Sequence, residues 1–463
     1  MAASLAEPRP TGDASEALAK RRTDRGGWLI TAFVFGLVLL QAATVAVRAK
    51  AISPFDEAAH FDYVVQLQHG NFPVPAGQRY SEEAVQNWAC RPTDRAASLA
   101  EVCGVAGSPS DPRVLFGGIN YEARYGPIYY GLAALGSTIL RGAGVENFTA
   151  ARLVSGLLYA LGTALLVLVA LRMAVSSIAA GGVILAASAT GLSLSVGATV
   201  GPDAMAFLGT AAVIASALLS PTWRSAVVST ILVAAVAGLA KPNFIVMAIL
   251  GSSLLLLRWT WIERRFATDV TQSSLVRFGI GLALPVVASA AASAGWAALA
   301  VARSQTDAPP DGGINLVLQS SLDPAARVAE HLWAILRPDG GTVPGPAFTM
   351  LDTPLLGVAG LVVAIATMGA CLGAWLWPAG ESRSVLLLRA VAVAVPLSAV
   401  TLTAIFWMTV DGGHATASRY GLPLFAAASV GLGASVTRRA ALAVAIFGVT
   451  AWLVAWIGIF GSG

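Results

Sequence analysis

The sequence predicts an all-α polytopic membrane protein, and three observations support this fold class. The chain has 463 residues, of which 56% are hydrophobic and only 12% are charged, whereas a soluble globular chain carries about 25% charged residues. Apolar runs of about 20 residues, the length that crosses a bilayer as a helix, recur along the chain. The net charge is only +4, and the basic residues lie mostly at the ends of the apolar runs, which is typical of topology signals and argues against nucleic-acid binding.

The N-terminal segment is polar and ends in a Lys-Arg-Arg cluster shortly before the first apolar run. We expect residues 1–26 to form a disordered cytoplasmic tail and residues 27–49 to cross outward, because basic clusters stay on the cytoplasmic side. This apolar run is too long for a cleaved secretory signal. Residues 27–463 are therefore expected to form one integral domain of the plasma membrane.

A long polar segment rich in proline and glycine follows the first crossing. It is too long for a plain connector, so we expect an ordered external loop that carries short juxtamembrane helices. The loop contains Cys90 and Cys103, and the sequence leaves open whether they form a disulfide or stay free thiols. Residues 125–140 are apolar but short, at about 16 residues against the ~20 needed to cross. We expect them to lie at the outer surface, so that the first external loop covers residues 50–152.

The later basic residues decide this topology. If residues 125–140 do not cross, ten arginines near the ends of the later crossings fall on the cytoplasmic side; if they do cross, these arginines fall outside, against the positive-inside rule. The ten are Arg172, Arg224, Arg258, Arg264, Arg265, Arg277, Arg383, Arg389, Arg438 and Arg439. We therefore predict about 11 transmembrane helices, and a second external loop over residues 302–354. The later crossings are expected at residues 153–171, 178–200, 204–219, 226–240, 244–257, 276–301, 355–377, 385–408, 420–436 and 441–460.

Two adjacent carboxylates and an imidazole, Asp56, Glu57 and His60, follow the first crossing directly. Ionisable groups at a membrane boundary are costly and usually mark a site. Asp56 and His60 share one face of a helix, and a partly desolvated carboxylate can have its pKa raised towards that of a useful base. The alternative is a helix start alone, with Ser53 as N-cap, Pro54 at the first position and acids in the first turn.

Further polar residues fall on the same predicted outer face. Asp203 lies in a short Gly-Pro-Asp turn, for which a turn with an N-cap is the alternative. Lys241 precedes a proline that breaks an apolar stretch; a bound anion would offset the cost of its charge, and the alternative is a lysine that reaches the lipid headgroups. The guanidinium of Arg419 suits phosphate, whereas Arg419 with Tyr420 is also typical of an interfacial anchor.

Three more residues complete the candidate set. Arg124 lies just before residues 125–140 and is either a phosphate partner or an interface anchor. Asp411 and His414 lie in the polar link that precedes Arg419.

In their order along the chain, these motifs resemble those of GT-C type glycosyltransferases. The resemblance rests on the acidic motif after the first helix, Tyr-Gly-Pro-Ile-Tyr-Tyr from residue 125, Arg-Leu from residue 152, Gly-Pro-Asp-Ala from residue 201, Lys-Pro from residue 241, and Arg-Tyr-x-x-Pro from residue 419. It is strongest to a bacterial branch known mainly as predicted membrane proteins. Members often have His-Pro-Pro or Lys-Pro-Pro where this chain has Tyr-Gly-Pro. The Ala, Gly, Val and Arg usage is typical of a high-GC bacterium such as an actinobacterium.

The resemblance implies a GT-C-like bundle and an inverting transfer of a sugar from a polyprenyl-phosphate donor to a cell-envelope glycan or lipid acceptor on the extracytoplasmic face. It implies Asp56 as general base, with Glu57 as the alternate and His60 beside them. The implied partners of the donor phosphate are Arg419, Lys241, Arg124 and Tyr420, and the implied acceptor-positioning residues are Asp203, His414 and Asp411. Whether a divalent metal takes part stays open, since carboxylates and imidazole are suitable ligands.

Two other classes of function stay open. One is a transporter or flippase of a lipid-linked glycan, and the other is a non-catalytic membrane scaffold. A transporter would place ionisable groups near the bilayer midplane on broken helices. Here the charged residues gather on one predicted face of the membrane domain. This favours a reaction at the membrane surface, where membrane lipids are neighbours.

Overall fold

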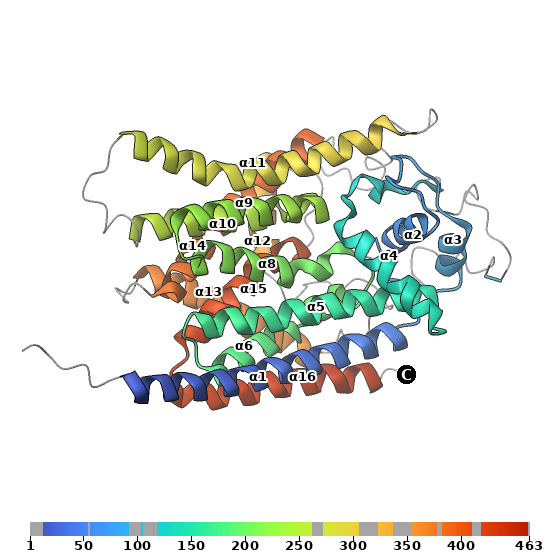
Figure 1. Cartoon of the computed structure of the whole chain (residues 1–463). Helices are drawn as coiled ribbons and strands as arrows, with labels where there is room; N and C mark the ends of the chain where they lie inside the picture. Colours follow the sequence, from blue (N-terminus) through green and yellow to red (C-terminus); the bar gives the residue numbers. More distant parts are fainter. Residues whose placement is uncertain are drawn as a thin grey trace, which may run out of the picture.

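The computed structural model describes residues 13–53, 56–91, 103–104, 114, 118–261, 272–304, 323–336, 354–376, 382–409 and 418–461. These residues form a bundle of long α-helices and contain no β-strand (Figure 1), which confirms the predicted all-α fold class. The α-helices are α1 (Asp13–Arg48), α2 (Glu57–Gln68), α3 (Glu82–Ala89), α4 (Pro127–Gly142), α5 (Asn147–Arg172), α6 (Ser177–Ser188), α7 (Gly191–Gly197), α8 (Ala206–Ile214), α9 (Trp223–Ala240), α10 (Ile245–Trp261), α11 (Gln272–Ala302), α12 (Pro324–Leu336), α13 (Pro354–Leu376), α14 (Arg383–Thr409), α15 (Leu422–Ser435) and α16 (Arg438–Gly461). Short turns precede several of them: η3 (Tyr121–Arg124), η4 (Pro202–Met205), η6 (Pro242–Phe244) and η10 (Ser418–Gly421), with the π-helical η5 (Ala215–Leu219) after α8.

The described helices make the chain a multi-pass membrane protein. Nine of them are long and apolar enough to cross a membrane, and the pair α6–α7, bent by 76°, makes a tenth if it is one span. The remaining predicted crossing, at residues 420–436, corresponds to α15, which has only 14 residues. It packs against α6, α8, α13 and α14, and its side chains are mostly buried. A short helix suffices there because other helices, and not lipid, surround it.

Helix α4 forms where the sequence predicts a short surface segment. It has 16 residues and packs against α2 and α5. Figure 1 shows it beside α2 and α3 at one end of the bundle, at a steep angle to α5. We call this end, formed by α2, α3, α4 and η3, the loop end.

A glycine fixes the start of α4 against the bundle. A Cβ atom on Gly126 would lie 1.8 Å from the carbonyl oxygen of Leu239, near the end of α9. Only a residue without a side chain allows this approach. The contact brings η3 and α4 next to Lys241, the residue that follows α9.

One local prediction, the disordered tail, is wrong, and so is the alternative in which Ser53 caps a helix. Helix α1 begins at Asp13, so residues 13–26 are helical and not disordered; this segment contains three alanines and three arginines, which are strong helix formers. Helix α2 begins at Glu57 with Asp56 as its N-cap residue, so Ser53 is not the cap. The backbone N–H of Ser53 instead donates to Glu57 Oε2 at 2.6 Å.

The structure also decides a question that the sequence left open. Cys90, which follows α3, forms a disulfide with Cys103. The bond closes the chain over a separation of 13 residues at the loop end.

Candidate functional site

Four of the predicted site residues, from four segments of the chain, meet at the loop end. Arg419 Nη2 donates to Asp56 Oδ2 at 2.7 Å. Lys241 Nζ donates to both carboxylate oxygens of Asp203 at 2.7 Å. Arg419 Nε lies 3.6 Å from Asp203 Oδ2, so the two ion pairs join into one alternating row. We call Asp56, Arg419, Asp203 and Lys241 the charge cluster.

The local sequence explains why these side chains lie at helix ends or in the short turns before helices. Asp203 is the second residue of η4, which begins at a proline and leads into α8. Lys241 ends α9 because the proline after it cannot continue that helix. Arg419 lies in η10, directly before α15. Each charged residue therefore lies at a helix end and not in the middle of an apolar helix.

The charge cluster is buried on one side and open on the other. Lys241 is fully buried, and the side chains of Asp203 and Arg419 are only 6% and 8% exposed. The side chain of Asp56 is 30% exposed. Asp56 is thus the most exposed member of the charge cluster.

Asp56 has a strained backbone and two polar partners. Its φ of 63° lies in the left-handed region, which non-glycine residues rarely adopt and which is often found at functional sites. The Tyr121 hydroxyl donates to Asp56 Oδ1 at 2.6 Å, and Arg419 occupies the other oxygen. Burial by itself raises the pKa of Asp56, but the Arg419 guanidinium, His60 and the Tyr121 hydroxyl outweigh it and lower that pKa to about 2. Asp56 is therefore ionised at neutral pH.

His60 lies behind Asp56 as a neutral imidazole. Its Nδ1 is 2.8 Å from the Tyr130 hydroxyl, and its Nε2 has no hydrogen-bond partner within the described residues. Burial lowers the pKa of His60 to about 3, although the Asp56 carboxylate opposes this shift. In the tautomer whose Nδ1–H donates to the Tyr130 hydroxyl, the bare Nε2 is an available metal ligand or hydrogen-bond acceptor.

Glu122 joins this group, although the sequence analysis did not select it. It lies in η3, which is held on α2 because Asn120 Nδ2 donates to Asp62 Oδ2 and to the carbonyl of Ala59, at 2.7 and 3.0 Å. Burial, and then the charge of Asp56, raise the pKa of Glu122 well above its usual value. Its Oε2 has no partner in the part of the chain that the structure describes. The sequence signal that could have identified Glu122 is an acidic residue in the segment just before Tyr125.

Asp56, His60 and Glu122 offer ligand atoms that all lie within 4.8 Å of one another. Two carboxylates and an imidazole suit a divalent transition metal, and the unpartnered atoms of His60 and Glu122 fit that use. Neither Glu57 nor Asp203 belongs to this group.

Glu57 has a structural environment instead of the catalytic one expected for an alternate base. Both of its oxygens bond to Arg152, at 2.7 Å from Nε and 2.6 Å from Nη2. The backbone N–H groups of Ser53 and Val200 donate to the same carboxylate. The side chains of Glu57 and Arg152 are 0% and 1% exposed, so Glu57 has no oxygen left for a substrate.

The structure describes two of the four remaining predicted residues, Tyr420 and Arg124. The ring of Tyr420 lies 5.3 Å from Lys241 Nζ and stacks on Phe406. Arg124 is the last residue of η3, two positions after Glu122. Asp411 and His414 fall in residues 410–417, outside the described residues.

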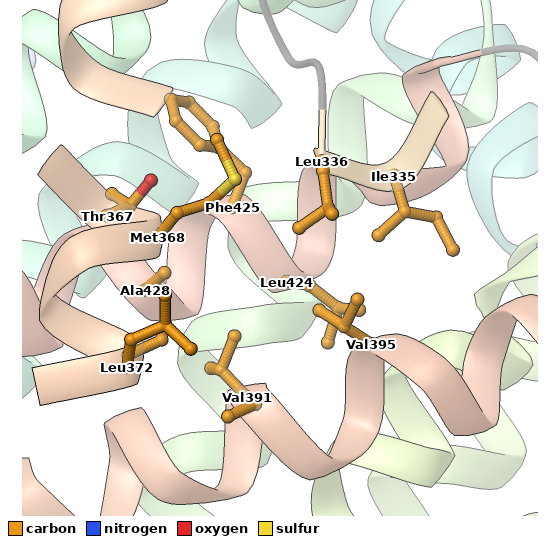
Figure 2. Close-up of a pocket in the computed structure, with 12 residues that line it drawn as sticks. Ile335, Leu336, Thr367, Met368, Leu372, Val391, Val395, Leu424, Phe425 and Ala428 are labelled. Atoms are coloured by element: carbon orange, nitrogen blue, oxygen red, sulfur yellow. The ribbon is translucent and has the colours of Figure 1, made fainter. Parts of the chain in front are cut away.

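An apolar pocket lies next to the segment that holds Arg419. It has a volume of about 220 Å³ and is lined by side chains of α12, α13, α14 and α15 (Figure 2). Leu424 and Phe425 of α15 form one wall, and they follow Arg419 closely in the same segment. Ile335 of α12 also lines the pocket, and its carbonyl oxygen would lie 2.5 Å from a Cβ atom on Gly421. The pocket is therefore fixed relative to η10.

No protein-family model and no curated protein matches this chain. One solved structure that it matches is ArnT from Cupriavidus metallidurans bound to undecaprenyl phosphate, with a TM-score of 0.39, 16% sequence identity, and coverage of 92% of this chain and 77% of that chain. The apo state of the same protein matches with a TM-score of 0.38, 16% identity and the same coverage of 92% and 77%. At these scores the likeness assigns neither family nor activity, and the interpretation of the site rests on its own geometry.

Proposed function

We propose that the chain is a GT-C type membrane glycosyltransferase. It moves a sugar from a polyprenyl-phosphate donor to a glycan or lipid acceptor of the cell envelope, at the extracytoplasmic face of the plasma membrane. The observation that carries this proposal is the charge cluster, in which an accessible carboxylate at Asp56 pairs with the buried Arg419, and Asp203 links Arg419 to the buried Lys241. Transfer from a sugar phosphate needs these groups together: a base for the acceptor and cations for the leaving phosphate.

The proposed reaction is an inverting displacement. Asp56 accepts the proton of an acceptor hydroxyl, and that oxygen forms a bond to the anomeric carbon while the bond from this carbon to the phosphate oxygen breaks. The electron pair of the broken bond stays on polyprenyl phosphate. Arg419 and Lys241 stabilise the charge that develops there, and Asp203 orients both cations through its contacts at 2.7 and 3.6 Å.

Donor binding would also prepare the base. In the free site Arg419 is bonded to Asp56 and holds its pKa at about 2, which makes Asp56 a weak base. A donor phosphate competes for the same guanidinium, so the Arg419–Asp56 pair weakens. The pKa of Asp56 then rises, and its carboxylate becomes a stronger base only when the donor is in place.

Two further features support the proposal. The pocket beside η10 is apolar and lies among helices of the bundle, so it suits the hydrocarbon chain of a lipid-linked donor (Figure 2). A divalent ion held by Asp56, His60 and Glu122 would supply Lewis-acid stabilisation of charge when bound.

Purified protein incubated with a panel of polyprenyl-phosphate sugars and envelope acceptors tests the proposal. We expect release of polyprenyl phosphate together with a glycosidic product, and loss of both in Asp56→Asn with an unchanged unfolding midpoint. Glu146→Gln, which removes an exposed carboxylate, is the matched control and should retain activity. Absence of turnover with every donor by folded protein would refute an enzyme, and lipid flux without product would indicate a transporter.

A further inference from the structure

Arg327 of α12 is a buried cation that the proposed reaction does not use. Its side chain is 1% exposed. The guanidinium Nη1 contacts Glu330, which lies on the same helix and is 35% exposed. The other two nitrogens, Nε and Nη2, have no hydrogen-bond partner among the residues that the structure describes.

An arginine in this state is costly for the fold. A buried charge needs its donors satisfied, and each unmade bond leaves the desolvation of that donor uncompensated. The N-terminus of α12 does not explain the position of Arg327, because Asp323 already caps that helix through Ala326 N at 2.9 Å. An arginine fork with two free donors is the geometry that binds a carboxylate or a phosphate.

The same face of α12 connects Arg327 to the charge cluster. Arg327, His331 and Ile335 are buried at intervals of four residues, and such residues lie on one side of a helix. His331 Nδ1 is 2.7 Å from Thr403 Oγ1, and its ring packs against Phe406. Phe406 stacks on Tyr420, which is next to Arg419.

The position of Arg327 along α12 relates it to η10, the turn that contains Arg419. Ile335 touches the backbone of Gly421 in η10. Arg327 precedes Ile335 by two helical turns, a rise of about 12 Å. Arg327 therefore lies two helical turns from the contact between α12 and η10, on the same buried face of α12.

We propose that Arg327 is the centre of a second anion-binding site, in which Nε and Nη2 bind a phosphate or carboxylate oxyanion carried by a substrate. The anion is either a further charged group of the donor or an acidic group of the acceptor. The existence of the site stands on the contacts of Arg327 alone, whereas its use by a substrate rests on the proposed function.

Binding of inorganic phosphate to the purified full chain tests the site, by calorimetric titration at constant ionic strength. We expect Arg327→Gln to weaken phosphate binding about tenfold or to remove one bound phosphate, the effect of one charge-assisted hydrogen bond or more. Arg141→Gln, at an exposed arginine, is the control for charge and should bind as the wild type does. Wild-type protein that binds no phosphate, or Arg327→Gln that binds it unchanged, would overturn the site.

A parallel Arg419→Gln variant separates this inference from the proposed function. Phosphate binding that depends on Arg327 but not on Arg419 supports the second site and speaks against Arg419 as the donor-phosphate residue. Phosphate binding that depends on Arg419 but not on Arg327 supports Arg419 as the donor-phosphate residue and overturns the second site.

A stability measurement separates a binding role of Arg327 from a structural one. Without phosphate, Arg327→Met should be as stable as the wild type or more stable, because it removes two unsatisfied donors; a clear loss of stability contradicts a binding role. In the transfer assay, a raised KM for the donor alone assigns the anion to the donor, and a raised KM for an acidic acceptor alone assigns it to the acceptor. Unchanged values of both KM contradict its use by a substrate.

Discussion

Replacing Glu57 by glutamine should destabilise the fold far more than it affects the chemistry. The Glu57 carboxylate accepts four hydrogen bonds: two from Arg152 and one each from the backbone N–H groups of Ser53 and Val200. Glutamine keeps one oxygen and places an NH₂ group against donors at the other position. Two charge-assisted bonds are then lost, at roughly 1.5–3 kcal/mol each.

A second estimate of the cost agrees with the first. Both partners of the pair are buried, with 0% and 1% exposed side chains, and breaking such a pair from one side costs about 3–5 kcal/mol. Arg152 would keep its bonds to the carbonyls of Ala49 and Ala51 and one bond to the remaining side-chain oxygen, but it would lose its charged partner. We therefore expect Glu57→Gln to lower the free energy of unfolding by about 3–5 kcal/mol.

Unfolding by SDS titration in mixed micelles measures this difference. The control is Glu146→Gln, which breaks a pair with Arg91 in which the glutamate side chain is 54% exposed; exposed pairs contribute about 0–1 kcal/mol. The double replacement of Glu57 and Arg152 by leucine and methionine should recover part of the loss, because no unpaired charge remains. A Glu57→Gln variant as stable as Glu146→Gln would refute a structural role for Glu57.

Four further predictions follow from the site and its supports. Gly126→Ala should prevent α4 from seating, because its Cβ would lie 1.8 Å from a carbonyl oxygen of α9, whereas Gly131→Ala in the same helix has open space and should be neutral; the yield of folded protein and its unfolding midpoint compare them. Ala428→Phe, which fills part of the apolar pocket, should raise KM for a long-chain donor and leave a short-chain donor unaffected. The stability that Asp56 contributes should be present above about pH 4 and be lost as the pH falls through about 2. In Arg419→Gln the pKa of Asp56 should rise, so its protonation, followed by carboxylate infrared absorption, should occur at higher pH; an unchanged titration would contradict the ion pair.

Much of the architecture follows from properties that are local in the sequence. Apolar runs and their flanking arginines predict the membrane helices, and the proline after Lys241 predicts the break between α9 and α10. The short length of residues 125–140 predicts α4. Charges that are costly in a membrane predict four of the residues that the structure brings together, since few other positions on that face carry a charge.

The contacts that decide the role of each residue depend on long-range packing. Glu57 and Arg152 are 95 positions apart, and no spacing rule distinguishes a glutamate in such a pair from the proposed base one position earlier. Glu122 lies in a loop without a periodic pattern, so its approach to Asp56 and His60 appears only in three dimensions. The same holds for Arg327, whose burial depends on the packing of α12 against α14 and η10.

The residues of the charge cluster are far apart in the sequence, and this separation determines which fragments of the chain can form the cluster. Its members lie at positions 56, 203, 241 and 419, so the ribosome must deliver nearly the whole polypeptide before the cluster is complete. A fragment containing only the first loop would include Asp56 but neither cation. Reconstitution therefore requires the intact membrane-embedded chain, and a premature stop before residue 419 should leave Asp56 without its guanidinium partner.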